Sequence, residues 1–159
     1  MSFRPGTRIG VDVGTVRVGV ARTDAAGILS LPVRTLRRSP DGAELTVLAR
    51  IVGEFDPIEI VVGLPLGLSG KEGAASSAAR HYAGAIARRI PGVPIRLVDE
   101  RLTTVSAHQA LYGAGRDGRK HRSVVDQVAA TMILDQALAI ERSTGEPAGE
   151  LLTAEVTDE

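Results

Sequence analysis

A short apolar run between two prolines is the feature that most constrains the fold of this chain of 159 residues. Residues 58–64 are bounded by Pro57 and Pro65, which is typical of a strand covered on both faces. Such a strand is central and parallel to the first strand, and each parallel connection needs a helix as its return path. The run therefore predicts an α/β fold with helices on both faces of a sheet.

The patterns on either side of this run give the order of the elements. β-Branched residues predict strands at 7–13, 16–23 and 31–36, and the first two form a hairpin. Helices are expected at about 40–55, with Ser39 as N-cap, and at 74–90, leading into a strand at 93–98. Thr103 or Thr104 can cap the next helix, residues 112–122 read as a loop, and Ser123 caps the last helix. The predicted fold class is α/β with a five-stranded mixed sheet: three antiparallel strands, then two parallel crossover strands.

Composition narrows the class of protein further. The absence of cysteine excludes a disulfide framework, a thiolate metal site and a cysteine nucleophile. No apolar run is long enough for a signal peptide or a membrane span, so we expect a cytoplasmic protein without a membrane partner. The three histidines share no metal-ligand spacing, so any metal is expected to be bound by oxygen.

The formal net charge of zero hides a division along the chain. Residues 143–159 hold five acidic residues and no lysine or arginine, which leaves residues 1–142 at a formal +5. We expect residues 1–142 to form one domain with a mildly basic body, and residues 143–159 to be an acidic, disordered tail.

Three carboxylates stand at positions that favour chemistry. Asp12 lies inside an apolar strand, where burial is costly unless the charge is paired or bound to a cation; the alternative is an aspartate satisfied by amides of the following turn. Asp99 and Glu100 follow a strand at the edge where α/β proteins bind ligands, and alternation lets only one of them reach the site. Asp126 flanks the apolar face of the last helix, although a capping acid would look the same.

Together these acids match the needs of phosphodiester hydrolysis. Two Mg²⁺ or Mn²⁺ ions about 4 Å apart can activate water and neutralise the leaving oxygen. Such hard ions prefer carboxylate oxygen. Two acids at strand ends and one on a covering helix would supply a metal-binding cage.

Basic residues suggest a partner for such a site. The predicted loop contains one acidic residue and four basic ones, Arg116, Arg119, Lys120 and Arg122. Arg101 directly follows Asp99 and Glu100. These five residues are our candidates for contact with a phosphate backbone, and a merely solvated loop is the alternative. Aromatic residues make up 3% of the chain, which does not favour sequence-specific reading of stacked bases.

Four blocks, in order between about residues 9 and 138, resemble the YqgF/RuvX family: GVDVGT at 10–15 with GVA at 19–21, IVVGLPL at 60–66, DERLTT at 99–104, and VD at 125–126 with AA at 129–130. The resemblance implies a ribonuclease H-like nuclease domain, related to Holliday junction resolvases, that processes the 5′ end of pre-16S ribosomal RNA. It also implies that Asp12, Glu100 and Asp126 form a catalytic, metal-binding triad, with Glu100 chosen over Asp99. Residues 67–70 read GLSG, where the family often has asparagine, so the resemblance implies the triad but not the substrate contacts of this loop.

Other functions remain open at this stage. A sugar kinase or actin-like ATPase shares the Asp-x-Gly-Thr hairpin, but it closes two such domains around nucleotide, and this chain has room for one. A resolvase of four-way DNA would act as a homodimer cutting symmetrically, whereas a ribosomal RNA enzyme needs no such symmetry. A non-catalytic RNA-binding assembly factor would gain nothing from clustered acids.

Overall fold

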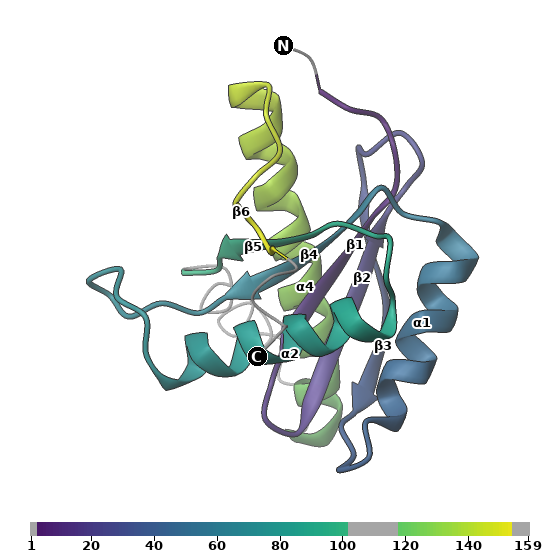
Figure 1. The fold of residues 1–159 in the computed structure, drawn as a ribbon, viewed down its shortest axis with the longest axis vertical. Coiled ribbons are helices and arrows are strands. Elements are labelled where there is room, and N and C mark those ends of the chain that lie inside the picture. The colour runs from purple at the N-terminus through teal and green to yellow at the C-terminus, as the bar shows by residue number, and fades with distance from the viewer. Residues whose placement is uncertain (1–2, 102–117, 154–159) are drawn as a thin grey trace.

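The computed structural model describes residues 3–101 and 118–153, and Figure 1 shows its path. The described strands are β1 (Arg8–Val13), β2 (Arg17–Thr23), β3 (Ser30–Arg37), β4 (Glu59–Leu64), β5 (Ile95–Asp99) and β6 (Glu150–Leu151), and the described helices are α1 (Ala43–Phe55), α2 (Ala74–Arg89) and α4 (Gly118–Thr144). The five expected strands are therefore present.

One mixed sheet in the order β3-β2-β1-β4-β5-β6 organises these elements. β1, β2 and β3 pair antiparallel, while β4 pairs parallel with both β1 and β5. Every residue of β4 is buried, as predicted for a central strand. The predicted fold class is confirmed, except that β6 pairs antiparallel with β5 and makes the sheet six-stranded.

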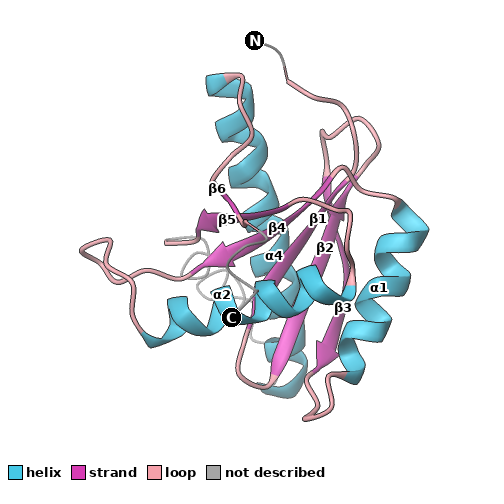
Figure 2. Ribbon diagram, viewed as in Figure 1, coloured by secondary structure: helices cyan, strands magenta, loops and turns pink. Residues whose placement is uncertain are grey.

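Helices cover the two faces of the sheet unequally (Figure 2). α1 and α2 pack on one face over a core that includes Val11, Val20 and Ile60. Among the described helices, only α4 packs on the other face, over a smaller core that includes Ala21 and Val61. Side chains alternate between these faces along each strand. Successive residues of β1 or β2 therefore pack against α4 on one face and against α1 and α2 on the other.

The expected helix start at Pro40 is wrong. α1 begins at Ala43, after Gly42 in the left-handed region with a φ of 73°. Ser39 closes a turn instead, because its side-chain oxygen accepts a hydrogen bond from the Ala43 amide at 3.1 Å. This turn delays the start of the helix by three residues.

The last helix begins earlier than expected. α4 starts at Gly118, so the predicted loop is wrong over residues 118–122 and Ser123 is not an N-cap. Arginine and lysine are strong helix formers, which favours the added turn. The rest of the predicted loop, and the helix expected to start at Thr103 or Thr104, lie outside the described residues.

The prediction of a disordered tail is wrong for residues 143–153. After α4, Ala148 is buried with 2% of its surface exposed, and β6 extends the sheet. The amide of Leu152 also donates to the carbonyl of Ile95 at 2.9 Å. Backbone pairing with an edge strand orders these residues in spite of their glycines and proline. Residues 154–159 lie outside the described part.

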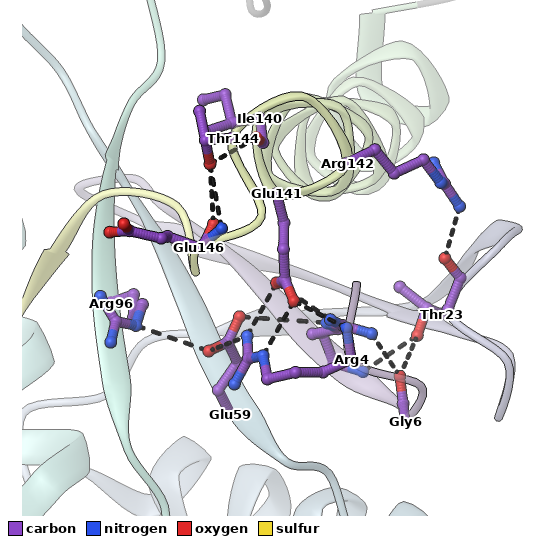
Figure 3. A network of polar contacts seen from close by, with 12 residues as sticks. Arg4, Gly6, Thr23, Glu59, Arg96, Ile140, Glu141, Arg142, Thr144 and Glu146 are labelled. Atoms are coloured by element: carbon purple, nitrogen blue, oxygen red, sulfur yellow. Dashed lines mark hydrogen bonds and ion pairs between the residues drawn. The ribbon is translucent and has the colours of Figure 1, made fainter. Parts of the chain in front are cut away.

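A buried ion cluster joins the N-terminal segment, β1, β4 and α4 (Figure 3). Arg4 contacts Glu59 at 3.0 Å and Glu141 at 2.8 Å, and Arg8 contacts Glu141 at 3.0 Å. Hydrogen bonds from Arg4 lower the pKa of Glu141 to about 2. The cluster anchors the C-terminal part of α4 where β1 and β4 begin.

Among the described helices, none is long and apolar enough to cross a membrane.

Candidate active site

The carboxyl ends of two parallel strands bring Asp12 and Glu100 together. Asp12 is the last residue but one of β1, and Glu100 directly follows β5. The two carboxyl groups lie close enough to act on each other, on the sheet face that α4 covers. The contact joins residues 88 positions apart in sequence and lies where α/β proteins commonly bind ligands.

Both carboxyls are disfavoured as anions at this place. Burial raises the pKa of Asp12, and the negative charge of Asp126 raises it further. Burial likewise raises the pKa of Glu100, followed by the charge of Asp12. An ionised Asp12 thus favours the neutral form of its neighbour Glu100. The pair therefore shares a proton more readily than two ordinary carboxylates would.

Asp126 lies beside this pair but has another partner. It is close enough for its charge to act on Asp12, and its side chain is 18% exposed. Arg17, at the start of β2, donates from Nε to Oδ2 of Asp126 at 3.0 Å. Two of the three predicted acids are thus in contact, and the third is held by an arginine that the sequence analysis did not single out.

Signals for Arg17 were nevertheless present in the sequence. The predicted hairpin puts Arg17 at the start of its second strand, and alternation puts it on the same face as Gly19. Gly19 is the register partner of Asp12. The partner of Arg17 on α4, 109 residues away, could not be read from any local pattern.

Glycines on the α4 face of the sheet let the helix and the acids approach closely. A Cβ at Gly10 would lie 2.6 Å from Cγ of Leu134. At Gly19 it would overlap the backbone of Asp126, and at Gly63 it would overlap the carboxylate of Glu100. The chain itself therefore fills the space beside these three glycines. A side chain larger than hydrogen at Gly19 or Gly63 would displace Asp126 or Glu100.

Asp99 and Arg101 form a separate pair outside this site. Arg101 donates to Asp99 from Nε at 2.9 Å and from Nη2 at 2.6 Å. The hydrogen bond from Arg101 lowers the pKa of Asp99. The neighbouring acids therefore diverge, as strand alternation predicts, and Glu100 alone reaches Asp12. Arg101 also lies near the GLSG loop, where Leu68 is 97% exposed.

The predicted basic residues are only partly placed. Arg119, Lys120 and Arg122 belong to the first turns of α4 rather than to a loop, and their side chains lie outside the description. Arg116 lies outside the described residues altogether. Contact of these residues with nucleic acid stays a prediction.

The chemistry of the site suits a divalent cation, although the predicted cage is not assembled as it stands. Within residues 3–101 and 118–153, no three acidic or histidine side chains converge closely enough to hold a metal ion. Asp12 and Glu100 present oxygen donors whose ionised forms are disfavoured by burial and mutual repulsion. A bound Mg²⁺ or Mn²⁺ would relieve that repulsion, because hard cations prefer carboxylate oxygen. The three acids fit such an ion if Asp126 leaves its hydrogen bond with Arg17 and binds the ion instead.

The raised pKa values predict how stability depends on pH in the metal-free protein. A carboxyl whose pKa is higher in the folded than in the unfolded state stabilises the fold fully below its unfolded pKa, and this contribution is lost as the pH rises through the folded pKa. The ordinary values are 3.8 for Asp12 and 4.5 for Glu100. We therefore expect the thermal midpoint, measured in chelator, to fall as the pH rises above this range.

Asp12→Asn provides the control, since it removes one of the two coupled carboxyls. Its midpoint should fall less over the same range. Glu141 contributes in the opposite sense, but its contribution is fully present above its ordinary pKa of 4.5 and so stays constant over this range. Parallel curves for the wild type and Asp12→Asn would show that the pair is not coupled as described.

Comparisons with known proteins agree on one family. Residues 6–140 match the RuvX family, described as "Holliday junction resolvase". A protein of Thermobifida fusca is 51% identical over 157 residues, which cover 94% of this chain and 98% of that protein. One from a Nocardioides species is 49% identical over 155 residues, with the same coverage. Both are named "Putative pre-16S rRNA nuclease".

Solved structures support the fold. The RuvC protein of Thermus thermophilus, in complex with a Holliday junction substrate, matches with a TM-score of 0.57 at 16% identity, covering 89% of this chain and 99% of that one. A second RuvC structure from this organism matches with a TM-score of 0.51 at 15% identity, covering 86% of this chain and 97% of that one. The expected ribonuclease H-like fold is confirmed by these matches.

Proposed function

Since this chain belongs to the RuvX family, we propose that it is a metal-dependent endonuclease that processes the 5′ end of pre-16S ribosomal RNA. Membership makes it a nuclease, a hydrolase that acts on ester bonds. The relatives in Thermobifida fusca and Nocardioides carry the name of the ribosomal RNA activity over nearly their whole length. Pre-16S ribosomal RNA is the substrate that this name supports, and we expect the chain to act on it in the cytoplasm.

The contact between Asp12 and Glu100 carries the proposal. A buried pair of like-charged groups lowers the stability of the fold. Carboxyls with shifted pKa values at the end of a strand are typical of catalytic sites. Asp126 adds a third carboxylate from α4 within electrostatic reach of Asp12. Phosphodiester hydrolysis uses this kind of oxygen-rich site.

Asp12 and Glu100 would bind Mg²⁺ or Mn²⁺, with Asp126 as a third ligand. When bound, the ion would supply a more acidic water and neutralise charge on the leaving oxygen. The chain's own residues do the rest: burial beneath α4 keeps Asp12 and Glu100 close together and shields them from solvent. Arg17 positions Asp126 through a hydrogen bond from Nε.

Cleavage of two matched labelled substrates, a ribosomal RNA precursor fragment and a four-way DNA junction, tests this function in Mg²⁺ or Mn²⁺. We expect cutting of the RNA near the mature 5′ end and loss of cutting in chelator. Asp126→Asn should cut far more slowly, because it removes a carboxylate at the site while keeping the shape of the side chain. Cleavage that persists in chelator would contradict the metal-dependent assignment.

A Holliday junction resolvase is the second candidate, favoured by the family description and by the likeness to the RuvC fold. It requires a homodimer whose two sites cut symmetrically. Symmetric cutting of the junction without cutting of the RNA would establish it. Binding of RNA without cleavage of either substrate would instead favour a non-catalytic assembly factor.

A further inference from the structure

Two arginines lie directly opposite each other beside the acidic site. Arg17 of β2 and Arg37 of β3 are register partners in the antiparallel pair. Like charges in this arrangement destabilise a sheet, because the side chains of directly opposed residues are neighbours. The pair therefore calls for an anion that lies between or above the two guanidinium groups.

Both arginines belong to the face of the sheet that carries the acids. Arg17 reaches Asp126 on α4. Thr35, two residues before Arg37, accepts a hydrogen bond from Gln127 of α4 at 3.1 Å, which places this side of β3 on the same face. β2 begins and β3 ends at the sheet edge where β1 ends, so the arginines continue the row that starts with Glu100 and Asp12.

The two arginines differ in how they are engaged. The side chain of Arg17 is 30% exposed and is fixed by Asp126. Arg37 is exposed and has no hydrogen bond or ion pair with the residues that the structure describes. Asp126 neutralises the charge of one arginine, and the charge of the other remains available to a ligand.

We propose that Arg17 and Arg37 form a phosphate subsite that binds the nucleic-acid backbone beside the acidic site. Arginine presents a planar fork of donors that matches phosphate oxygens in a bidentate manner. A nucleic-acid strand that crosses this end of the sheet from β5 towards β3 would reach Asp12 and Glu100 first and this subsite next. Arg37 is a binding residue rather than a catalytic one, because it lies two strands away from Asp12. The inference rests on the proposed nuclease function.

A matched pair of variants in β3 tests the subsite. Arg37→Gln removes the proposed contact. Arg34→Gln removes the same charge from an exposed position on the opposite face, since Arg34 is the register partner of Val20, which belongs to the core under α1 and α2. Binding of the labelled RNA fragment and of the four-way DNA junction is measured in chelator, over a series of salt concentrations.

We expect Arg37→Gln to weaken binding about three- to tenfold and to lower the slope of log K against log salt by about 0.7 for single-stranded RNA or about 0.9 for duplex DNA. Arg34→Gln should keep the wild-type slope. Arg37→Lys should restore the slope but only part of the affinity, because lysine keeps the charge without the fork. Thermal unfolding of each variant checks the fold.

Equal slopes for Arg37→Gln and Arg34→Gln, with strong binding by the wild type, would overturn the subsite and leave the nuclease function standing. Absence of wild-type binding to both nucleic acids would overturn the two together. A change with one nucleic acid alone would support the subsite and identify the backbone that it recognises.

Discussion

Replacing Asp12 by asparagine is expected to abolish cleavage while leaving the fold as stable as before or more stable. Asparagine keeps the shape of the side chain but cannot carry the charge on which the proposed metal site depends. Loss of a group that acts at the centre of a catalytic unit commonly lowers the rate by on the order of a thousandfold or more. Burial and the charge of Asp126 raise the pKa of Asp12, so a neutral residue also relieves repulsion.

Cleavage rate and thermal midpoint, measured on the same purified variant, separate these two effects. Asp135→Asn is the matched control, because Asp135 is exposed on α4 and the change in charge is the same. It should cut at the wild-type rate. Metal-dependent cleavage by pure Asp12→Asn would remove Asp12 from the site, whereas a large drop in the midpoint would show that its charge supports the fold.

Replacing Gly19 by alanine should damage both stability and activity. The added methyl group would overlap the backbone of Asp126, and backbone inside a helix cannot rotate away as a flexible side chain can. Overpacking of this kind typically costs about 1–3 kcal/mol and occasionally more. Because the displaced segment carries Asp126, we expect cleavage to fall with the free energy of unfolding.

Gly53→Ala is the control for this change. Gly53 lies in α1, and nothing would lie within 4 Å of its added Cβ, so alanine should stabilise the protein by about 0.5–1 kcal/mol through its helix propensity. Denaturant unfolding and cleavage assays compare the two variants. A Gly19→Ala protein with wild-type stability would show that α4 lies farther from β2 than described.

The sequence predicted the parts of the fold that local patterns control. The apolar run of β4 and the β-branched residues of the first strands were sufficient to predict which of the five main strands are antiparallel and which are parallel. Helix starts were less accurate, because Ser39 and Ser123 look like caps wherever they stand, and only the surrounding turn decides whether a helix begins there. The tail was wrong because pairing of β6 with an edge strand overrides a polar, glycine-containing composition.

The candidate site was predictable for a different reason. Asp12 lies near the end of β1 and Glu100 directly follows β5, so the parallel arrangement of these strands puts both residues at the same end of the sheet. The choice of Glu100 over Asp99 came from the family resemblance. The ion pair between Arg17 and Asp126, and the overlap that a side chain at Gly19 would cause, depend on how far α4 stands from the sheet. That distance is set by the packing of residues more than a hundred positions apart, and no local pattern encodes it.

The buried ion cluster has a consequence for how this chain can vary in length. Glu141 anchors α4 at one end of the sheet, and Asp126 meets Gly19 at the other, so 15 residues of helix span a fixed interval of about 22 Å. One residue inserted between them would rotate Asp126 by about 100° around the helix axis and turn it away from Asp12. Single-residue insertions and deletions between residues 126 and 141 should therefore be rejected, because the length of this part of α4 fixes where Asp126 lies in the active site.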